Sequence, residues 1–137
     1  MHRHLVDTGA LIALIDRNET WHAEVKSAMA AIRLPLIATQ AVLTETLYFA
    51  QKIRGTEPIW SMVLDKTIVV APIEETELPA LHTLMTRYAD RPMDFADATL
   101  VHVAEREKIS TILTIDHDDF ETYRIGRNKR FRILPAR

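Results

Sequence analysis

The 137-residue chain contains no cysteine. A disulfide framework, a thiolate metal site and a cysteine nucleophile are therefore excluded. No apolar run approaches the roughly 20 residues that cross a bilayer, and the chain does not open with a charged segment followed by an apolar one. We therefore expect a protein of the reducing cytoplasm that carries no visible export signal and does not span a membrane.

Internal repeats and low-complexity linkers are also absent. With 47% hydrophobic and 26% charged residues, the composition suits one compact domain over residues 1–137. Apolar runs of strand length alternate with helical patterns, which predicts an α/β fold with a parallel sheet. The predicted strands are 4–6, 35–38, 67–71, 111–115 and 131–134. The predicted helices are 10–16, 20–33, 40–54, 57–65, 75–88 and 95–107.

The net charge is only −2, but it is unevenly distributed, because no acid follows Glu121. The basic residues of this tail are Arg124, Arg127, Lys129, Arg130, Arg132 and Arg137, with Tyr123 and Phe131 interleaved. Such a segment can hold the phosphates of a nucleic acid, and Arg124, Arg127, Lys129 and Arg130 are the candidate contacts. The alternative is a terminal strand whose exposed bases only aid solubility.

Four acidic residues, far apart in the chain, stand in stretches that otherwise predict buried structure. Asp7 and Asp116 each end an apolar strand. Glu45 lies on an apolar helix face, and Asp97 opens an apolar helix with Asp94 three residues before it. Because ligands of open parallel sheets bind at the carboxyl ends of the strands, we expect all four acids around one cleft.

A shared cation explains these acids better than local ion pairs do. No Lys or Arg lies within four residues of Glu45, or of Asp7 on its C-terminal side. A buried carboxylate without a partner is costly, so it protonates, finds a base or binds a cation. Oxygen ligands without cysteine or an evident histidine pair favour Mg²⁺ or Mn²⁺ over Zn²⁺.

Each acid also has an ordinary structural interpretation. Asp7 can be a helix N-cap, and Asp97 with its neighbour Asp94 can simply complement a helix dipole. Glu45 can pair with a distant base. Asp116 and the residues after it can form a solvated turn, and His117 is best explained as an ordinary histidine of that turn.

The helix predicted at 20–33 carries an apolar stripe that includes Trp21, Val25 and Met29. Such stripes normally face the core, although this one can also form part of a groove for a protein partner.

Several motifs together suggest a family. They are Val6-Asp7-Thr8-Gly9-Ala10-Leu11-Ile12-Ala13-Leu14, Thr44-Glu45, Asp94-Phe95-Ala96-Asp97-Ala98-Thr99-Leu100 and Leu113-Thr114-Ile115-Asp116-His117-Asp118-Asp119-Phe120. In order and spacing they resemble the motifs of PIN-domain ribonucleases, and more narrowly those of VapC-type toxins of toxin–antitoxin pairs. The resemblance covers the chain from the first strand to about Phe120.

The resemblance implies a PIN-like three-layer α/β/α fold with a parallel, five-stranded central sheet. It implies a Mg²⁺- or Mn²⁺-dependent endoribonuclease that acts as the toxin of a type II pair, forms a homodimer and is inhibited by a cognate antitoxin. The metal ligands and catalytic residues would be Asp7, Glu45, Asp97 and Asp116. The supporting residues would be Thr8, Asp94, Thr114 and Asp119.

The main alternative is a non-catalytic RNA- or protein-binding module on the same fold. A Mg²⁺-dependent phosphatase or a phosphoacceptor receiver domain would need a second acid close to Asp7, but Thr8 and Gly9 occupy those places. Neither of these last two classes fits the sequence.

Overall fold

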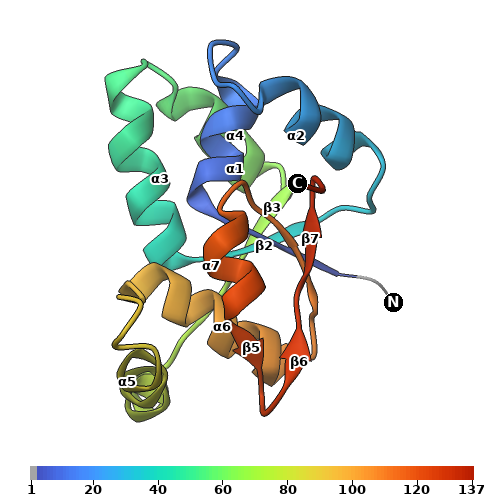
Figure 1. Cartoon of the computed structure of the whole chain (residues 1–137). Helices are drawn as coiled ribbons and strands as arrows, with labels where there is room; N and C mark the ends of the chain where they lie inside the picture. The colour runs from blue at the N-terminus through green and yellow to red at the C-terminus, as the bar shows by residue number, and fades with distance from the viewer. Residues whose placement is uncertain (1–2) are drawn as a thin grey trace.

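The computed structural model describes residues 3–137, which form a sheet of five strands with only parallel pairings. The strands lie in the order β3-β2-β1-β4-β7 (Figure 1). Their bounds are β1 His4–Val6, β2 Leu36–Thr39, β3 Ile68–Ala71, β4 Thr111–Leu113 and β7 Arg132–Leu134. The predicted five-stranded parallel sheet is therefore confirmed.

Helices cover the sheet on two sides. In Figure 1, α1, α2 and α4 lie above the sheet, and α5 and α6 lie below it. The bounds are α1 Thr8–Ile15, α2 His22–Ala30, α3 Gln40–Lys52, α4 Thr56–Leu64, α5 Leu78–Arg87, α6 Phe95–Glu107 and α7 His117–Thr122, with a 3₁₀ turn at Glu75–Glu77. None of the helices in the described part of the chain is long and apolar enough to cross a membrane.

The central strands β1 and β4 are short, apolar and covered on both faces. Leu5, Val6, Ile112 and Leu113 are each at most 1% exposed. This is the burial expected of a parallel strand with helices on either side, and it explains why these strands consist of continuous apolar runs.

Most element boundaries agree with the prediction within a few residues, and the differences have local causes. Strand β2 begins at Leu36 because Pro35 has no N–H, and the Leu36 N–H bonds to the carbonyl of Thr67 at 2.8 Å. The helix expected from residue 75 opens as a 3₁₀ turn, since Glu74 and Glu77 form a reciprocal capping box there.

The largest error concerns the segment after β4. Helix α7 lies there, whereas the helices predicted from the sequence end at residue 107, and β5 (Arg124–Ile125) and β6 (Lys129–Arg130) form an antiparallel pair that the sequence did not suggest. His117 is only 6% exposed, its Nε2 lies 2.9 Å from the carbonyl of Pro135, and its ring packs against Trp21. The interpretation of His117 as a solvated turn residue was therefore wrong.

The apolar stripe of α2 belongs to the core. Val25 is fully buried, and Trp21 and Met29 are partly buried against the main hydrophobic cluster. The core interpretation is therefore confirmed for this stripe.

Candidate functional site

Three helices begin at the carboxyl edge of the sheet with an aspartate cap. Asp7 Oδ1 accepts the Thr8 N–H at 2.8 Å at the start of α1. Asp94 Oδ1 accepts the Asp97 N–H at 2.8 Å at the start of α6, and Asp116 Oδ1 accepts the Asp119 N–H at 3.3 Å at the start of α7. The capping interpretation of Asp7 is therefore correct, and capping fixes these carboxylates at the edge where β1 and β4 end.

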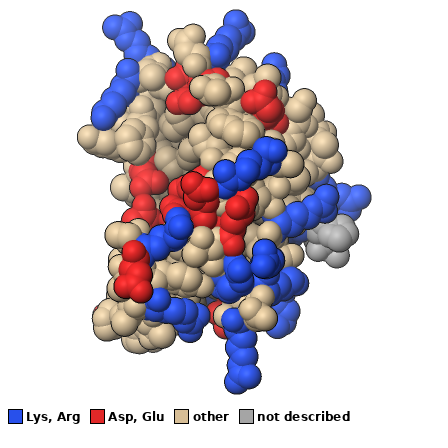
Figure 2. All heavy atoms as spheres, in the orientation of Figure 1, with Lys and Arg blue, Asp and Glu red and all other residues tan. Residues whose placement is uncertain are grey.

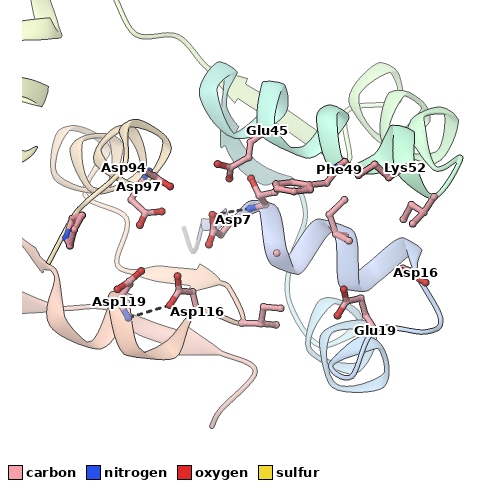
Figure 3. A pocket seen from close by; sticks show the side chains of 16 residues that line it. Asp7, Asp16, Glu19, Glu45, Phe49, Lys52, Asp94, Asp97, Asp116 and Asp119 are labelled. Carbon is pink, nitrogen blue, oxygen red and sulfur yellow. Dashed lines mark hydrogen bonds between the residues drawn. The ribbon is translucent and has the colours of Figure 1, made fainter.

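These caps line one cleft of about 660 Å³, together with Glu45 from α3 (Figure 3). Its acidic lining residues are Asp7, Asp16, Glu19, Glu45, Asp94, Asp97, Asp116 and Asp119, and among the described residues of the lining Lys52 is the one base. Asp16 and Glu19 lie apart from the other acids, beyond the end of α1 (Figure 3). The four acids singled out in the sequence thus surround a single cavity.

The tightest grouping within the cleft differs from the expected set. Asp97, Asp116 and Asp119 can each place a carboxylate oxygen within 4.8 Å of the other two. Asp119, expected only to support the site, belongs to this group because α7 carries it one helical turn after Asp116. Asp7 and Glu45 line the same cavity outside that group.

Glu45 is half-buried on α3, and Phe49, one turn later, also lines the cleft. No basic residue within residues 3–137 forms a salt bridge with Glu45. The alternative interpretation of Glu45 as half of a distant ion pair is therefore wrong for the described residues.

Burial dominates the electrostatics of the two deepest acids. Burial, opposed by the hydrogen bonds from Thr8 and Thr114 and assisted by the charges of Asp116 and Glu45, raises the pKa of Asp7 to about 7. Burial, followed by the charges of Asp7 and Asp94, raises the pKa of Asp97 to about 8. The fold therefore assembles mutually repelling carboxylates without a compensating base at either of these two positions.

Two hydroxyl groups fix the orientation of these carboxylates. Thr114 Oγ1 donates to Asp7 Oδ2 at 3.0 Å and accepts the Asp116 N–H at 3.0 Å, so it joins the two strand-end acids. The Tyr123 hydroxyl donates to Asp97 Oδ2 at 2.8 Å. By contrast, the Thr8 hydroxyl bonds to the carbonyl of Val42 at 3.4 Å, and Thr8 reaches Asp7 only through its N–H.

Sequence reasoning missed Tyr123 as a residue of the site. It grouped this side chain with the basic tail, but the ring is fully buried between Tyr88 and Phe120. The available signal was general: a buried tyrosine hydroxyl needs a hydrogen-bond partner, and Asp97 provides one.

A model of the PIN domain family matches residues 4–126 of the chain. The chain belongs to the PIN domain family. Its sequence is similar to that of Ribonuclease VapC26 from Mycobacterium tuberculosis (strain ATCC 25618 / H37Rv), with 27% identity over 134 residues, which cover 96% of this chain and 99% of that protein.

Two solved structures share the fold of this PIN domain. Mycobacterium tuberculosis VapC20, described as a sarcin-ricin loop cleaving toxin, aligns with a TM-score of 0.76 and 20% identity over 84% of this chain and 91% of that one. A toxin–antitoxin complex from Klebsiella pneumoniae aligns with a TM-score of 0.69 and 19% identity over 87% of this chain and 91% of that one. The fold is thus PIN-like, and the homology to VapC ribonuclease toxins is distant.

The cleft of this PIN domain has the donor set that a hard divalent cation requires. Every side chain of the close group is a carboxylate, and such oxygens suit Mg²⁺ or Mn²⁺ rather than Zn²⁺. The raised pKa values of Asp7 and Asp97 mean that their ionisation is costly in the cleft without a counter-charge, and a bound cation would favour the charged carboxylates. The residues present therefore fit a metal site.

Basic side chains gather on the same face, around β5 and β6 and below the acids (Figure 2). Arg127, Lys129 and Arg130 are exposed there. Arg124 donates to the carbonyls of Glu121, Thr122 and Tyr123, and it lines a cavity of about 380 Å³ with Arg87 and Arg127. The interleaved aromatics of the tail are not available for stacking, because Tyr123 and Phe131 are buried.

Proposed function

We propose that this PIN domain is a Mg²⁺- or Mn²⁺-dependent endoribonuclease, the toxin of a type II toxin–antitoxin pair, which cleaves single-stranded RNA in the cytoplasm. The observation that carries the proposal is the convergence of acids from β1, α3, α6 and α7 on one cleft. The distant homology to Ribonuclease VapC26 supports RNA as the substrate.

In this proposal Asp7, Glu45, Asp97 and Asp116 hold the cation. Asp119 is a further candidate ligand, since it lies in the closest group of carboxylates. A bound divalent cation would supply Lewis-acid activation of a water and stabilise charge on the leaving oxygen in phosphodiester hydrolysis.

Hydrogen bonds within the chain orient the carboxylates of this site in the absence of substrate. Thr114 and the Thr8 N–H each hold one oxygen of Asp7, so that carboxylate cannot rotate freely. Tyr123 keeps its proton, because burial and the neighbouring Asp97 charge raise the pKa of its hydroxyl. Tyr123 therefore acts as a donor that orients Asp97, and it cannot serve as a base.

The exposed basic side chains of the β5–β6 hairpin supply the proposed RNA contact. Arg127, Lys129 and Arg130 are exposed on or beside this hairpin, and basic side chains gather around it on the face that also carries acids (Figure 2). Arg124 contributes its charge nearby, although carbonyl groups already occupy its Nη1. Phosphates bound along this hairpin would lead an RNA strand towards the cleft.

A groove beside the cleft supports the antitoxin as a partner. It has a volume of about 750 Å³ and lies between α3 and α6, and Glu45 and Asp94 line both this groove and the acidic cleft. Tyr48, Phe49 and Phe95 line it and are 57%, 43% and 46% exposed. A protein segment packed against these rings would obstruct access to the acids. The toxin–antitoxin complex with a similar fold supports this partner, and the homodimer rests on the family resemblance.

The decisive experiment is cleavage of a mixed cellular RNA pool by purified protein with Mg²⁺, Mn²⁺ or EDTA. Asp7→Asn and Asp97→Asn are run in parallel, because each removes one cleft carboxylate with little change in shape. We expect cleavage that requires the metal and both aspartates, and the fragment ends would identify the target. Intact RNA with either metal, combined with tight RNA binding, would instead favour the non-catalytic module.

A further inference from the structure

One arginine forms an ion pair with an acid of the cleft. Arg91, in the loop between α5 and α6, donates from Nη1 to Oδ1 of Asp119 at 2.8 Å. Asp119 belongs to the close group of three carboxylates. Over residues 3–137, no other Arg, Lys or His makes a salt bridge to an acid that lines the cleft.

The loop fixes the backbone of Arg91 at the rim of the cleft. The Arg91 N–H bonds to the carbonyl of Tyr88 at 3.1 Å. Pro92 lines the cleft, Met93 is only 4% exposed, and Asp94 caps α6. The Arg91 side chain itself remains 44% exposed, so its backbone is anchored while its guanidinium is accessible.

The guanidinium of Arg91 has more N–H donors than its bond to Asp119 uses. An arginine carries five N–H donors in a planar fork that matches phosphate oxygens two at a time. Arg91 makes one side-chain hydrogen bond to a described residue, the bond to Asp119. Two other basic side chains near the cleft have partners outside the close group of carboxylates. Arg137 pairs with Asp118 and Glu121, and Lys52 lies over the rings of Tyr48 and Phe49.

A phosphodiester that enters this cleft meets mostly negative charge. A cation held by the acids would offset part of that charge and would weaken the attraction between Asp119 and Arg91. The released guanidinium would then lie at the cleft rim with no other described partner.

We propose that Arg91 is a substrate-binding residue that holds the phosphodiester of the RNA strand at the cleft, and that Asp119 is its partner only while RNA is absent. This inference rests on the proposed nuclease function, because it assumes an RNA phosphate in the cleft. Cation and RNA then favour each other's binding, since both separate Arg91 from Asp119.

The test compares Arg91→Ala and Arg91→Lys with Arg33→Ala. Arg33 is an exposed arginine between α2 and β2 that makes no hydrogen bond or salt bridge to a described residue, so it controls for the loss of one positive charge. We expect Arg91→Ala to raise KM for RNA about tenfold, as for a lost charge-assisted hydrogen bond. Arg91→Lys should recover part of that loss. A KM of Arg91→Ala equal to that of Arg33→Ala would overturn the proposal.

Binding of Mn²⁺ to the RNA-free protein gives a readout that does not depend on cleavage. Arg91→Ala should bind Mn²⁺ more tightly than the wild type does, because no guanidinium competes for Asp119. Weaker Mn²⁺ binding would mean that Arg91 shapes the acidic group, and this result would also overturn the proposal. The unfolding midpoint should stay close to that of the wild type, because exposed ion pairs contribute little to stability.

Failure of the proposed function would be recognised separately. If the wild type leaves all RNA intact in Mn²⁺, the nuclease proposal fails. The fluorescence anisotropy of a labelled single-stranded RNA then measures binding without cleavage. A roughly tenfold loss of RNA affinity in Arg91→Ala would still support the phosphate contact, and an affinity equal to that of Arg33→Ala would exclude it.

Discussion

The acidic cleft and the basic hairpin lie on one face of the molecule but are built differently (Figure 2). In the cleft, Asp7 and Asp97 are 7% and 8% exposed, and each accepts a hydrogen bond that fixes its orientation. On the hairpin, Lys129 and Arg130 are exposed and make no side-chain hydrogen bond or salt bridge to a described residue.

This difference shows how strongly each region indicates a function. Burial of repelling carboxylates costs free energy, so such a group persists where binding of a cation offsets the cost. Exposed lysine and arginine side chains cost the folded state little free energy, so they occur on surfaces without any function. The cleft is therefore strong evidence for a site, while the hairpin needs a binding measurement.

The largest expected effect comes from the most buried acid. Asp7→Asn should lower RNA cleavage more than about 100-fold, beyond the loss typical for an outer hydrogen bond of a metal site. The metal-free variant should also be more stable than the wild type at pH 8, because a neutral amide avoids the cost of a buried charge.

Cleavage assays and thermal unfolding of metal-free protein measure the two effects of Asp7→Asn. The matched control is Asp65→Asn, since Asp65 is exposed after α4 and accepts the Thr67 N–H away from the cleft. An Asp7→Asn protein as active as this control would refute the mechanism.

The next prediction tests the orientation of the Asp97 carboxylate without removing its charge. Tyr123→Phe removes the hydroxyl that donates to Asp97 and leaves the buried ring in place. We expect Mn²⁺ affinity to fall about 10- to 100-fold. Titration with Mn²⁺ checks this value. Tyr88→Phe is the control because its hydroxyl accepts the Arg124 N–H instead of bonding to a cleft acid, so this variant should bind Mn²⁺ as the wild type does.

A third prediction concerns the pH dependence of the metal-free protein. The fold raises the pKa of Asp7 from 3.8 to about 7 and that of Asp97 to about 8, so the folded state holds these protons more tightly than the unfolded chain does. The stability that this provides is complete below about pH 4 and is lost as the pH rises through 7 to 8. Each of these carboxyls lowers the free energy of unfolding by about 1.4 kcal/mol per pH unit between its ordinary pKa of 3.8 and its folded pKa, which is about 7 for Asp7 and about 8 for Asp97.

Denaturant unfolding at pH 5, 6, 7 and 8 in EDTA measures this loss. Added Mn²⁺ should restore the most stability at pH 8, where both acids are ionised and can bind it. Stability that rises between pH 5 and 8 in EDTA would contradict the raised pKa values.

The smallest effect is expected on the hairpin. Replacement of Lys129 and Arg130 by alanine should weaken RNA binding several-fold. It should also reduce the slope of log affinity against log salt concentration by about 0.7 per lost phosphate contact. Mn²⁺ affinity should not change, because both residues lie outside the cleft lining. Replacement of both Lys26 and Arg33 by alanine removes one exposed lysine and one exposed arginine, and is the matched control. RNA affinity equal to that of this control would leave the hairpin a role in solubility only.

Much of the fold could be predicted because its signals are local. Apolar runs at 4–6 and 111–115 indicate buried strands, and their order with the helices between them indicates a parallel sheet. The segment after β4 could not be predicted in this way. Its polar residues favour a turn, but Asp116 caps α7, and the burial of Phe120 stabilises that helix against the core.

By itself the sequence determined that strand-end and helix-borne acids would meet at the carboxyl edge, since a parallel sheet brings its strand ends together. Only the tertiary structure decided which carboxylates come closest and what orients them. Asp119 joins Asp97 through the turn of α7, and Tyr123 reaches Asp97 across 26 positions of the chain. Distances of this kind depend on how helices pack, and packing is set by the whole core rather than by any local pattern.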